Sequence, residues 1–229
     1  MLKPSFLPRL LNDTLAIAPL CVFLSLVVFH MGVLTLSNYL VQIPVDIADF
    51  HNTWGTFSFP LVYLATDLTV RLYGAPLARR VIACVMVPAL IFSYGISVLF
   101  QQGVYQGVEA LAVFNLFVAR IAFASFSAYL TGQLLDVTVM NRLRRLKQWW
   151  VAPAMSTIAG NALDTAAFYS VAFYQSTDAF MANNWVEIGL LDYGFKLIAC
   201  LFLSLPLYGV LLSYLERRLP GISLTSPIA

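Results

Sequence analysis

Long apolar stretches, separated by short polar gaps, take up most of the chain. Six of them are long enough to be membrane-spanning helices, at residues 15–40, 55–73, 81–101, 111–135, 151–174 and 186–215. A bilayer core about 30 Å thick needs about 20 predominantly apolar residues per helix. The chain is 60% hydrophobic and 10% charged, which leaves too little polar surface for a soluble domain. We therefore expect an all-α integral membrane protein with six transmembrane helices in a single domain, residues 1–229.

Basic residues gather in alternate gaps between these stretches. Of the 13 Lys and Arg residues, 11 lie before the first stretch, at the junction of the second and third, between the fourth and fifth, or after the sixth. The gaps at residues 41–54, 101–110 and 175–185 contain none. Lys and Arg are retained on the cytoplasmic side of a membrane. Both termini are therefore expected in the cytoplasm.

The six stretches divide into two halves of three, which would have opposite orientations in the membrane. Inverted repeats of this kind are a common plan in transporters. The middle stretch of each half carries a related motif, Ala-Thr-Asp at 65–67 and Ala-Leu-Asp-Thr at 162–165. Chance similarity between two apolar helices explains these motifs equally well, so the sequence leaves a 3+3 inverted repeat open.

Ionisable residues inside the apolar stretches are the main functional signal. A charge at mid-bilayer costs a few kcal/mol, so it is normally paired or functional. A rise of about 1.5 Å per helical residue gives the depth of each. The residues predicted near the midplane are Arg120, Asn161, Asp164 and Lys196. Asp67 is expected deeper towards the cytoplasm, and Asp192 nearer the outside.

Two acid–base pairs have the spacing of neighbours on one helix face. Asp67 and Arg71 are four residues apart, as are Asp192 and Lys196. A structural interpretation follows, in which ion pairs only hold the bundle together. The competing interpretation is that these charges contact a ligand or a proton.

Arg120 and Asp164 remain, and they belong to different helices at similar depth. We favour a functional role for them, because two buried charges are an expensive way to hold helices together. Asn161, Asp164 and Phe168 form one stripe of their helix. A carboxylate, an amide and an aromatic ring on one face suit a planar, hydrogen-bonding aromatic ligand.

The sequence carries no signature of an enzyme. It contains no nucleotide-binding loop, no metal-ligand spacing and no hydrolase nucleophile motif. His30 and His51 have no evident catalytic partner, and Cys21, Cys84 and Cys200 all fall within spans. We expect no metal, no cofactor, no enzymatic activity and no nucleic-acid partner.

Several longer motifs resemble one family, the queuosine-precursor transporters. The matching stretches are Ser-Asn-Tyr-Leu-Val-Gln (37–42), His-Asn-Thr-Trp-Gly-Thr-Phe-Ser-Phe-Pro (51–60), Leu-Ala-Thr-Asp-Leu-Thr-Val-Arg-Leu-Tyr-Gly-Ala-Pro-Leu-Ala-Arg-Arg (64–80), Phe-Asn-Leu-Phe-Val-Ala-Arg-Ile-Ala (114–122), Gly-Asn-Ala-Leu-Asp-Thr (160–165), Asn-Trp-Val-Glu-Ile (184–188) and Asp-Tyr-Gly-Phe-Lys (192–196). They cover nearly the whole chain except the first dozen residues and the tail after Leu219.

The resemblance implies import of 7-cyano-7-deazaguanine and 7-aminomethyl-7-deazaguanine, precursors of the tRNA nucleoside queuosine, across a bacterial inner membrane. The expected partners are this small base and the lipid bilayer, and a homo-oligomer stays open. The predicted substrate-binding residues are Asn38, Asp67, Asn115, Arg120, Asn161, Asp164, Phe168, Asp192 and Lys196.

Two other hypotheses compete with a carrier that works by alternating access around a midplane site. One is a substrate-binding membrane subunit that needs a separate ATP-driven module, as in vitamin importers. The other is a membrane scaffold that contains structural ion pairs only. Transport by the purified protein alone separates the first two, and ligand binding separates both from the scaffold.

Overall fold

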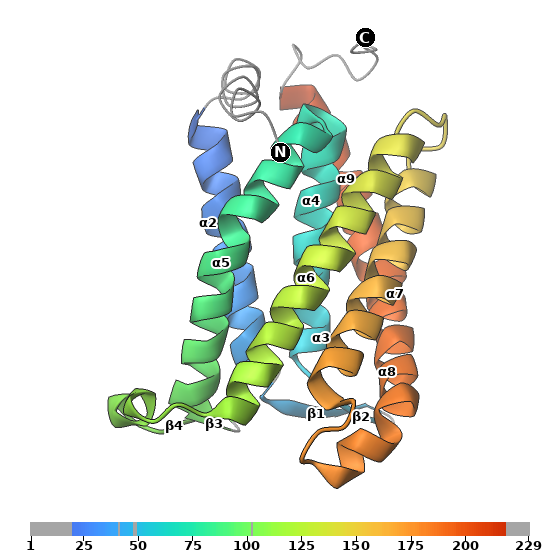
Figure 1. The fold of residues 1–229 in the computed structure, drawn as a ribbon. Coiled ribbons are helices and arrows are strands. Elements are labelled where there is room, and N and C mark those ends of the chain that lie inside the picture. Colours follow the sequence, from blue (N-terminus) through green and yellow to red (C-terminus); the bar gives the residue numbers. More distant parts are fainter. Residues whose placement is uncertain (1–19, 41, 48–49, 102, 219–229) are drawn as a thin grey trace, which may run out of the picture.

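The computed structural model describes residues 20–40, 42–47, 50–101 and 103–218. Helices dominate this part of the chain and pack side by side along one long axis (Figure 1). The all-α prediction is confirmed. The helices are α2 (Leu20–Leu40), α3 (Gly55–Ser58), α4 (Pro60–Tyr73), α5 (Ala75–Leu99), α6 (Leu116–Leu143), α7 (Val151–Phe173), α8 (Ala179–Ala199) and α9 (Leu205–Arg218). The predicted residues 15–19 of the first span lie outside the described part.

Short irregular elements connect the helices. A 3-10 turn, η1 (Val108–Ala112), precedes α6, and a π-helical segment, η2 (Cys200–Ser204), joins α8 to α9. Two antiparallel hairpins pair β1 (Pro44–Ile47) with β2 (Phe50–Thr53) and β3 (Phe100–Gln101) with β4 (Val104–Tyr105). Both hairpins lie at the same end of the bundle (Figure 1).

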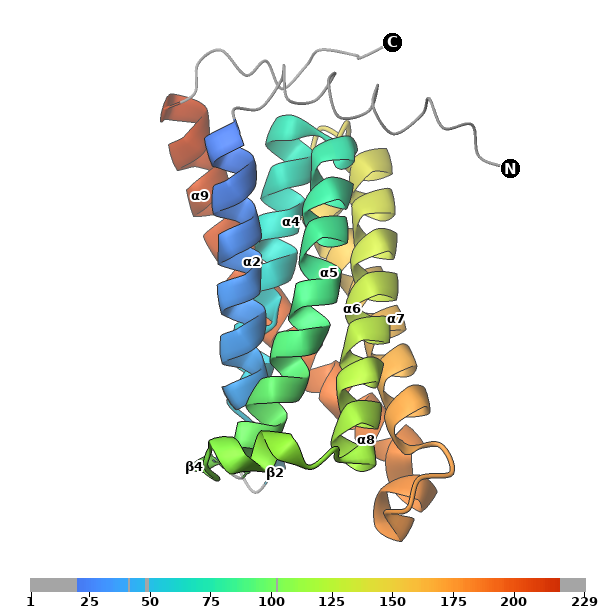
Figure 2. The same cartoon turned by 60° about the vertical axis from the view of Figure 1, so that its left-hand side comes forward.

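The described segments that border the basic gaps lie at the opposite end. The start of α2, the turn between α4 and α5, the loop between α6 and α7 and the end of α9 meet there in both views (Figures 1 and 2). Arg79 and Arg80 lie in the first two turns of α5, and Arg144 and Arg145 lie in the loop between α6 and α7. The charge alternation along the sequence thus corresponds to the two ends of the bundle. We call these the basic end and the hairpin end.

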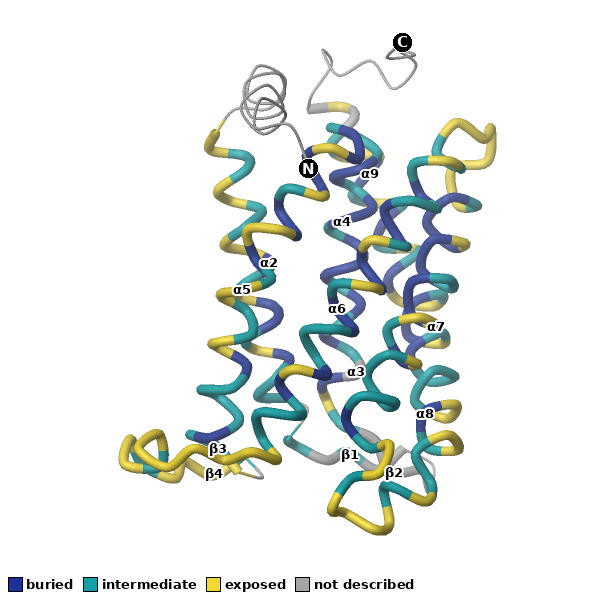
Figure 3. The backbone as a smooth tube through the Cα atoms, viewed as in Figure 1, coloured by how far each residue is buried: buried dark blue, intermediate teal, exposed yellow. Residues whose placement is uncertain are grey.

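Three helices in the described part of the chain are long and apolar enough to cross a membrane by length and composition. They are Leu20–Leu40, Ala75–Leu99 and the continuous helix Ala179–Leu215. Buried polar side chains are concentrated instead on α4, α6 and α7. Figure 3 shows that buried backbone gathers where these three helices come together. Helices in the middle of a membrane bundle can carry polar residues because other helices, and not lipid, surround them.

Two glycines bring α6 and α7 into close contact. A Cβ atom added to Gly132 would lie 2.8 Å from the Cβ of Asp164 and 3.0 Å from the carbonyl oxygen of Gly160. A Cβ atom added to Gly160 would lie 3.0 Å from the Cβ of Asp136. Small residues allow membrane helices to approach this closely. The crossing therefore places Asp136 of α6 and Asp164 of α7 near a shared interface.

The start of α6 differs from the predicted span at 111–135. The Asn115 side chain accepts a hydrogen bond from the backbone N–H of Val118 at 3.1 Å, which caps the helix immediately before Leu116. The residues before this cap form η1 and an extended connection. The helix then continues to Leu143. Each residue of α6 is therefore nearer the hairpin end than the predicted span implied.

Candidate functional site

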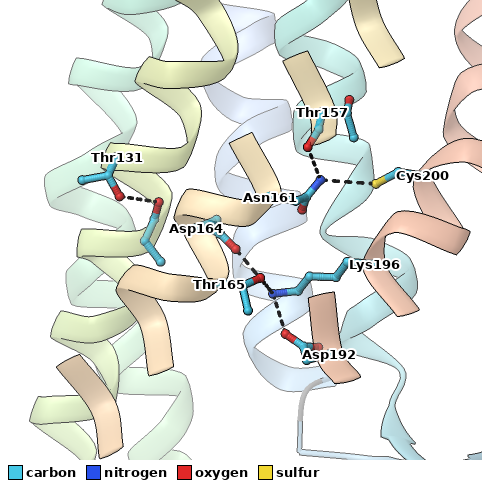
Figure 4. A network of polar contacts seen from close by, with 9 residues as sticks. Thr131, Thr157, Asn161, Asp164, Thr165, Asp192, Lys196 and Cys200 are labelled. Atoms are coloured by element: carbon cyan, nitrogen blue, oxygen red, sulfur yellow. Dashed lines mark hydrogen bonds and ion pairs between the residues drawn. The ribbon is translucent and has the colours of Figure 1, made fainter. Parts of the chain in front are cut away.

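A buried lysine lies between two aspartates inside the bundle (Figure 4). The Nζ of Lys196 is 2.8 Å from Asp192 Oδ2 and 3.4 Å from Asp164 Oδ2. Its third neighbour is the hydroxyl of Thr165, at 3.5 Å. The predicted Asp192–Lys196 pair is confirmed. We call Asp164, Asp192 and Lys196 the charged triad.

The triad joins two helices and carries more negative than positive groups. Asp164 belongs to α7, whereas Asp192 and Lys196 are one turn apart on α8. Lys196 is only 8% exposed. An ammonium between two carboxylates leaves one carboxylate incompletely matched, and a buried charge of this kind is stabilised by further hydrogen-bond donors. The arrangement can therefore receive a ligand that offers N–H groups.

Asn161 lies one turn from Asp164 on α7, on the side towards the basic end. Its Nδ2 donates to the carbonyl of Thr157 at 2.9 Å and approaches the Sγ of Cys200 at 3.5 Å. Cys200 is the first residue of the π-helical segment η2. Asn161 therefore connects α7 to the irregular part of the α8–α9 helix.

Phe168 lies one turn from Asp164 in the other direction, towards the hairpin end. Its ring packs edge-on against Tyr169 and Phe173, with centroid distances of 5.2 and 6.0 Å. The predicted stripe thus combines an amide, a carboxylate and an aromatic group along one helix.

Arg120 does not contact Asp164, and the prediction that both lie at a similar depth near the midplane is wrong. The Nε of Arg120 donates to the carbonyl of Val171 at 2.8 Å, and its Nη atoms donate to the carbonyls of Tyr174 and Gln175. These carbonyls terminate α7, where cationic side chains are favourable. The cause is the late start of α6, which puts Arg120 in the second turn of the helix near the hairpin end.

Asp67 and Arg71 also have other partners than predicted. Asp67 accepts a hydrogen bond from the Ser156 hydroxyl at 2.9 Å. Arg71 donates to the carbonyl of Arg144, and Arg144 donates to the carbonyl of Val70 at 2.9 Å. Within the described residues no ion pair joins Asp67 to Arg71, so that predicted pair is wrong. Arg71 instead ties the end of α4 to the end of α6.

Asn38 and Asn115 both have local roles near the hairpin end. Asn38 donates to the carbonyl of Leu34, one turn back in α2, at 2.9 Å. Asn115 is exposed and caps α6. The structure does not bring either side chain to the charged triad.

Sequence reasoning missed Asp136, which is completely buried on α6. It lies beside Asp67 and Ser156. The predicted span ended at residue 135, so Asp136 fell just outside it. The available signal was the polar pair Gln133 and Asp136, whose spacing puts both on one helix face.

A further polar chain runs from α2 to α6. The Nδ1 of His30 donates to the carbonyl of Leu26 at 2.8 Å, and its Nε2 lies 3.2 Å from Thr66 Oγ1. Thr66 donates to Gln133 Oε1 at 2.5 Å. The histidine is thus a packed residue that links three helices.

Comparison with known proteins finds that the chain is similar to membrane transporters. The family described as "Putative vitamin uptake transporter" matches residues 53–211. The chain is 61% identical to the "Queuosine precursor transporter" of Escherichia coli (strain K12) over 191 residues, which cover 83% of this chain and 86% of that protein. It is 53% identical to the "Probable queuosine precursor transporter" of Haemophilus influenzae over 203 residues, with the same coverage of each chain. No solved structure matches the chain.

These matches cover most of the chain and most of each relative. The relatives are transporters, and the apolar helices of this chain are those of a multi-pass membrane protein. The chain is therefore a transporter and not an enzyme, and it belongs to the queuosine precursor transporter family.

Proposed function

We propose that the chain imports 7-cyano-7-deazaguanine and 7-aminomethyl-7-deazaguanine across a bacterial inner membrane, for synthesis of queuosine in tRNA. The names of its relatives support this substrate class. The observation that carries the proposal is the charged triad, in which Asp164 of α7 meets Lys196 of α8 inside an apolar bundle. The proposal includes six membrane crossings with both termini in the cytoplasm.

Asp164 is the carboxylate best suited to bind the base. Lys196 lies closer to Asp192 than to Asp164, so Asp192 anchors the ammonium and Asp164 keeps more acceptor capacity. A guanine-like edge offers two adjacent N–H donors. A carboxylate accepting both makes charge-assisted hydrogen bonds, which are stronger than neutral ones.

The neighbours of Asp164 supply the other contacts of a planar base. Lys196 and Asn161 carry donors for the carbonyl of the base. Phe168 supplies an aromatic ring on which the base can stack. In this proposal Arg120, Asn38 and Asn115 support the bundle and do not contact the substrate, because their hydrogen bonds are local or go to helix ends.

Alternating access requires one part of the bundle to move against another around the site. The segment η2 follows Lys196 within one turn, and Pro206 lies two residues beyond it. π-helical segments interrupt regular α-helical bonding and are frequent at functional sites. We place the bend that opens and closes the site at η2, between α8 and α9.

The test is uptake by the purified protein alone in liposomes, with radiolabelled 7-cyano-7-deazaguanine as the probe. We expect saturable uptake that excess unlabelled cyano or aminomethyl base inhibits and adenine does not. Protein-free liposomes and a Lys196→Ala variant are the controls. Binding without transport would favour a subunit that needs an ATP-driven module. Absence of both binding and transport would defeat the proposal.

A further inference from the structure

A second charged cluster lies between the triad and the basic end. It contains Asp67 of α4 and Asp136 of α6, which face each other and are 2% and 0% exposed. Ser156 of α7 lies about 12 Å from Asp164 along the helix, since eight residues separate them. The two clusters are therefore distinct sites, and α7 is the helix that contributes to both.

Two carboxylates in contact inside a membrane bundle cannot both be ionised without a cation, because burial and mutual repulsion disfavour the second charge. Within the described residues no salt bridge reaches either one, and the ion pairs of Lys196 are with Asp164 and Asp192. Arg71 and Arg144 bind backbone carbonyls near the basic end. The pair therefore holds a proton or a small cation.

Ser156 allows Asp67 to change its charge without losing its hydrogen bond. The Ser156 hydroxyl is 2.9 Å from Asp67 Oδ1 and 3.1 Å from the carbonyl of Pro153. A hydroxyl has one proton to donate and can also accept. It donates to Asp67 when that carboxylate is ionised. When Asp67 is protonated, Asp67 donates to Ser156 and Ser156 donates to Pro153.

Asp136 has a different environment. Neither of its oxygens receives a hydrogen bond within the described structure, and the same holds for the Nε2 of Gln133 and the hydroxyl of Tyr63. Gln133 and Tyr63 are 1% and 5% exposed, so both donors are buried beside Asp136. Unpaired buried polar groups each cost about 1–3 kcal/mol. These donors can turn onto Asp136 when it becomes ionised.

The donors favour a proton over a metal cation as the bound species. A hard cation requires a shell of acceptor oxygens. Gln133 presents its NH2 group here, since its Oε1 is bound by Thr66. The N–H groups of this amide stabilise a carboxylate that has lost a proton, and they cannot act as ligands of a cation.

We propose that Asp67 and Asp136 bind one exchangeable proton, and that this proton drives import of the base. The inference rests on the proposed function, because it supplies the driving force for that transport. Tyr63 and Cys200 lie close to the pair, and Tyr208 lines a cavity beside Asp67. Other titratable or charged groups on the helices around the pair are Asp164, Lys196, His30, Arg71 and Arg144.

Tyr63 connects the proton pair to the charged triad. A Cβ atom on Gly132 would lie 2.6 Å from the Tyr63 hydroxyl and 2.8 Å from the Cβ of Asp164. The same hydroxyl is beside Gln133 and Asp136. A base that occupies Asp164 competes for the Tyr63 hydroxyl, which also lies near Asp136. Coupling between two sites is reciprocal, so base binding changes the proton affinity of the pair by the same factor as protonation changes the affinity for the base.

A small cavity of about 10 Å³ adjoins Asp67 on the side of η2. Asp67, Thr157 and Ser204 line it, and Ser204 belongs to the π-helical segment. The Ser204 hydroxyl is buried, and no hydrogen bond to it is formed within the described part of the chain. The bend proposed at η2 would therefore open the proton pair and the substrate site together.

The experiment uses the purified wild-type protein in liposomes that contain the pH indicator pyranine. Adding unlabelled 7-cyano-7-deazaguanine outside is expected to acidify the interior, and an inward proton gradient is expected to concentrate the labelled base. A sodium gradient should not concentrate the labelled base. Asp136→Asn should abolish the acidification and the accumulation, yet keep base binding within about threefold of wild type. Asp178→Asn, an exposed cap of α8, is the matched control and should behave as wild type.

Each alternative outcome bears on a specific claim. Uptake without proton movement, uptake driven by sodium, or normal accumulation by Asp136→Asn would overturn the proton pair and leave the proposed function intact. Lack of any uptake by the wild type would defeat the proposed function and this inference with it. If Asp136→Asn fails to insert, Asp67→Asn is the second variant, and the wild-type pyranine signal decides by itself.

Discussion

The ammonium of Lys196 lies 2.8 Å from the carboxylate of Asp192, one turn earlier on the same helix. Its contact with Asp164 on the neighbouring helix is longer, at 3.4 Å. The lysine is therefore anchored to its own helix and reaches towards the next.

Asp164→Asn should lose the base. The change keeps the side-chain volume but replaces an acceptor by a donor that opposes the N–H groups of the ligand. The loss should be about 2–4 kcal/mol, a factor of about 30 to 1,000 in affinity. Equilibrium binding of labelled 7-cyano-7-deazaguanine to the purified variant measures it. A dissociation constant within about threefold of wild type would exclude Asp164 as the group that binds the base.

The swapped double variant Asp192→Lys with Lys196→Asp should insert and remain folded but should not transport. The swap keeps an acid and a base on one helix face. It also puts a carboxylate where the ammonium now faces Asp164, so two like charges meet across the helices. Uptake assays measure the loss of transport, and thermal unfolding in detergent shows whether the double variant is still folded. Substantial uptake by the double variant would favour a purely structural pair.

Arg120→Ala should reduce stability more than binding. Arg120 holds the carbonyls of Val171, Tyr174 and Gln175 at the end of α7. A hydrogen bond to a charged group is worth about 1.5–3 kcal/mol, so the thermal midpoint should fall. The Arg120→Ala protein that is inserted in the membrane should bind the base with wild-type affinity. Normal stability with lost binding would instead place Arg120 in the substrate site.

Gly132→Ala should destabilise the bundle and slow uptake. A helical Gly→Ala change normally stabilises by about 0.5–1 kcal/mol. At Gly132 the new Cβ atom would lie within 3.0 Å of Tyr63, Asp164 and Gly160, and overpacking costs about 1–3 kcal/mol. Gly95→Ala on α5 is the matched control, because nothing lies within 4 Å of its Cβ position. Equal thermal midpoints for the two variants would contradict the close crossing.

A reporter fused after Ala229 should be active in the cytoplasm and inactive in the periplasm. The start of α2 and the end of α9 lie at one end of the bundle with the basic loops (Figures 1 and 2), and basic loops stay in the cytoplasm. A green fluorescent protein fusion reports a cytoplasmic end, and an alkaline phosphatase fusion reports a periplasmic end. Activity of the phosphatase fusion would reverse the orientation and move the proton pair to the outer half of the membrane.

The sequence alone determined the features that depend on neighbouring residues. The apolar stretches established the all-α membrane class, and the local motifs indicated the family. The Asp192–Lys196 pair was predictable because the helical period of 3.6 residues brings positions four apart onto one face. The alternation of basic gaps likewise predicted which loops share an end of the bundle.

Tertiary structure decided which charges meet across helices. Such a pairing depends on where each helix begins and how two helices cross, and neither is a property of one residue's neighbours. Asn115 starts α6 late and moves Arg120 away from Asp164. Gly132 and Gly160 let α6 and α7 approach closely. Asp136 of α6 thereby lies at the interface with α7 and beside Asp67 of α4. An error of one helical turn shifts a side chain by about 5.4 Å, and that distance is enough to exchange one buried partner for another.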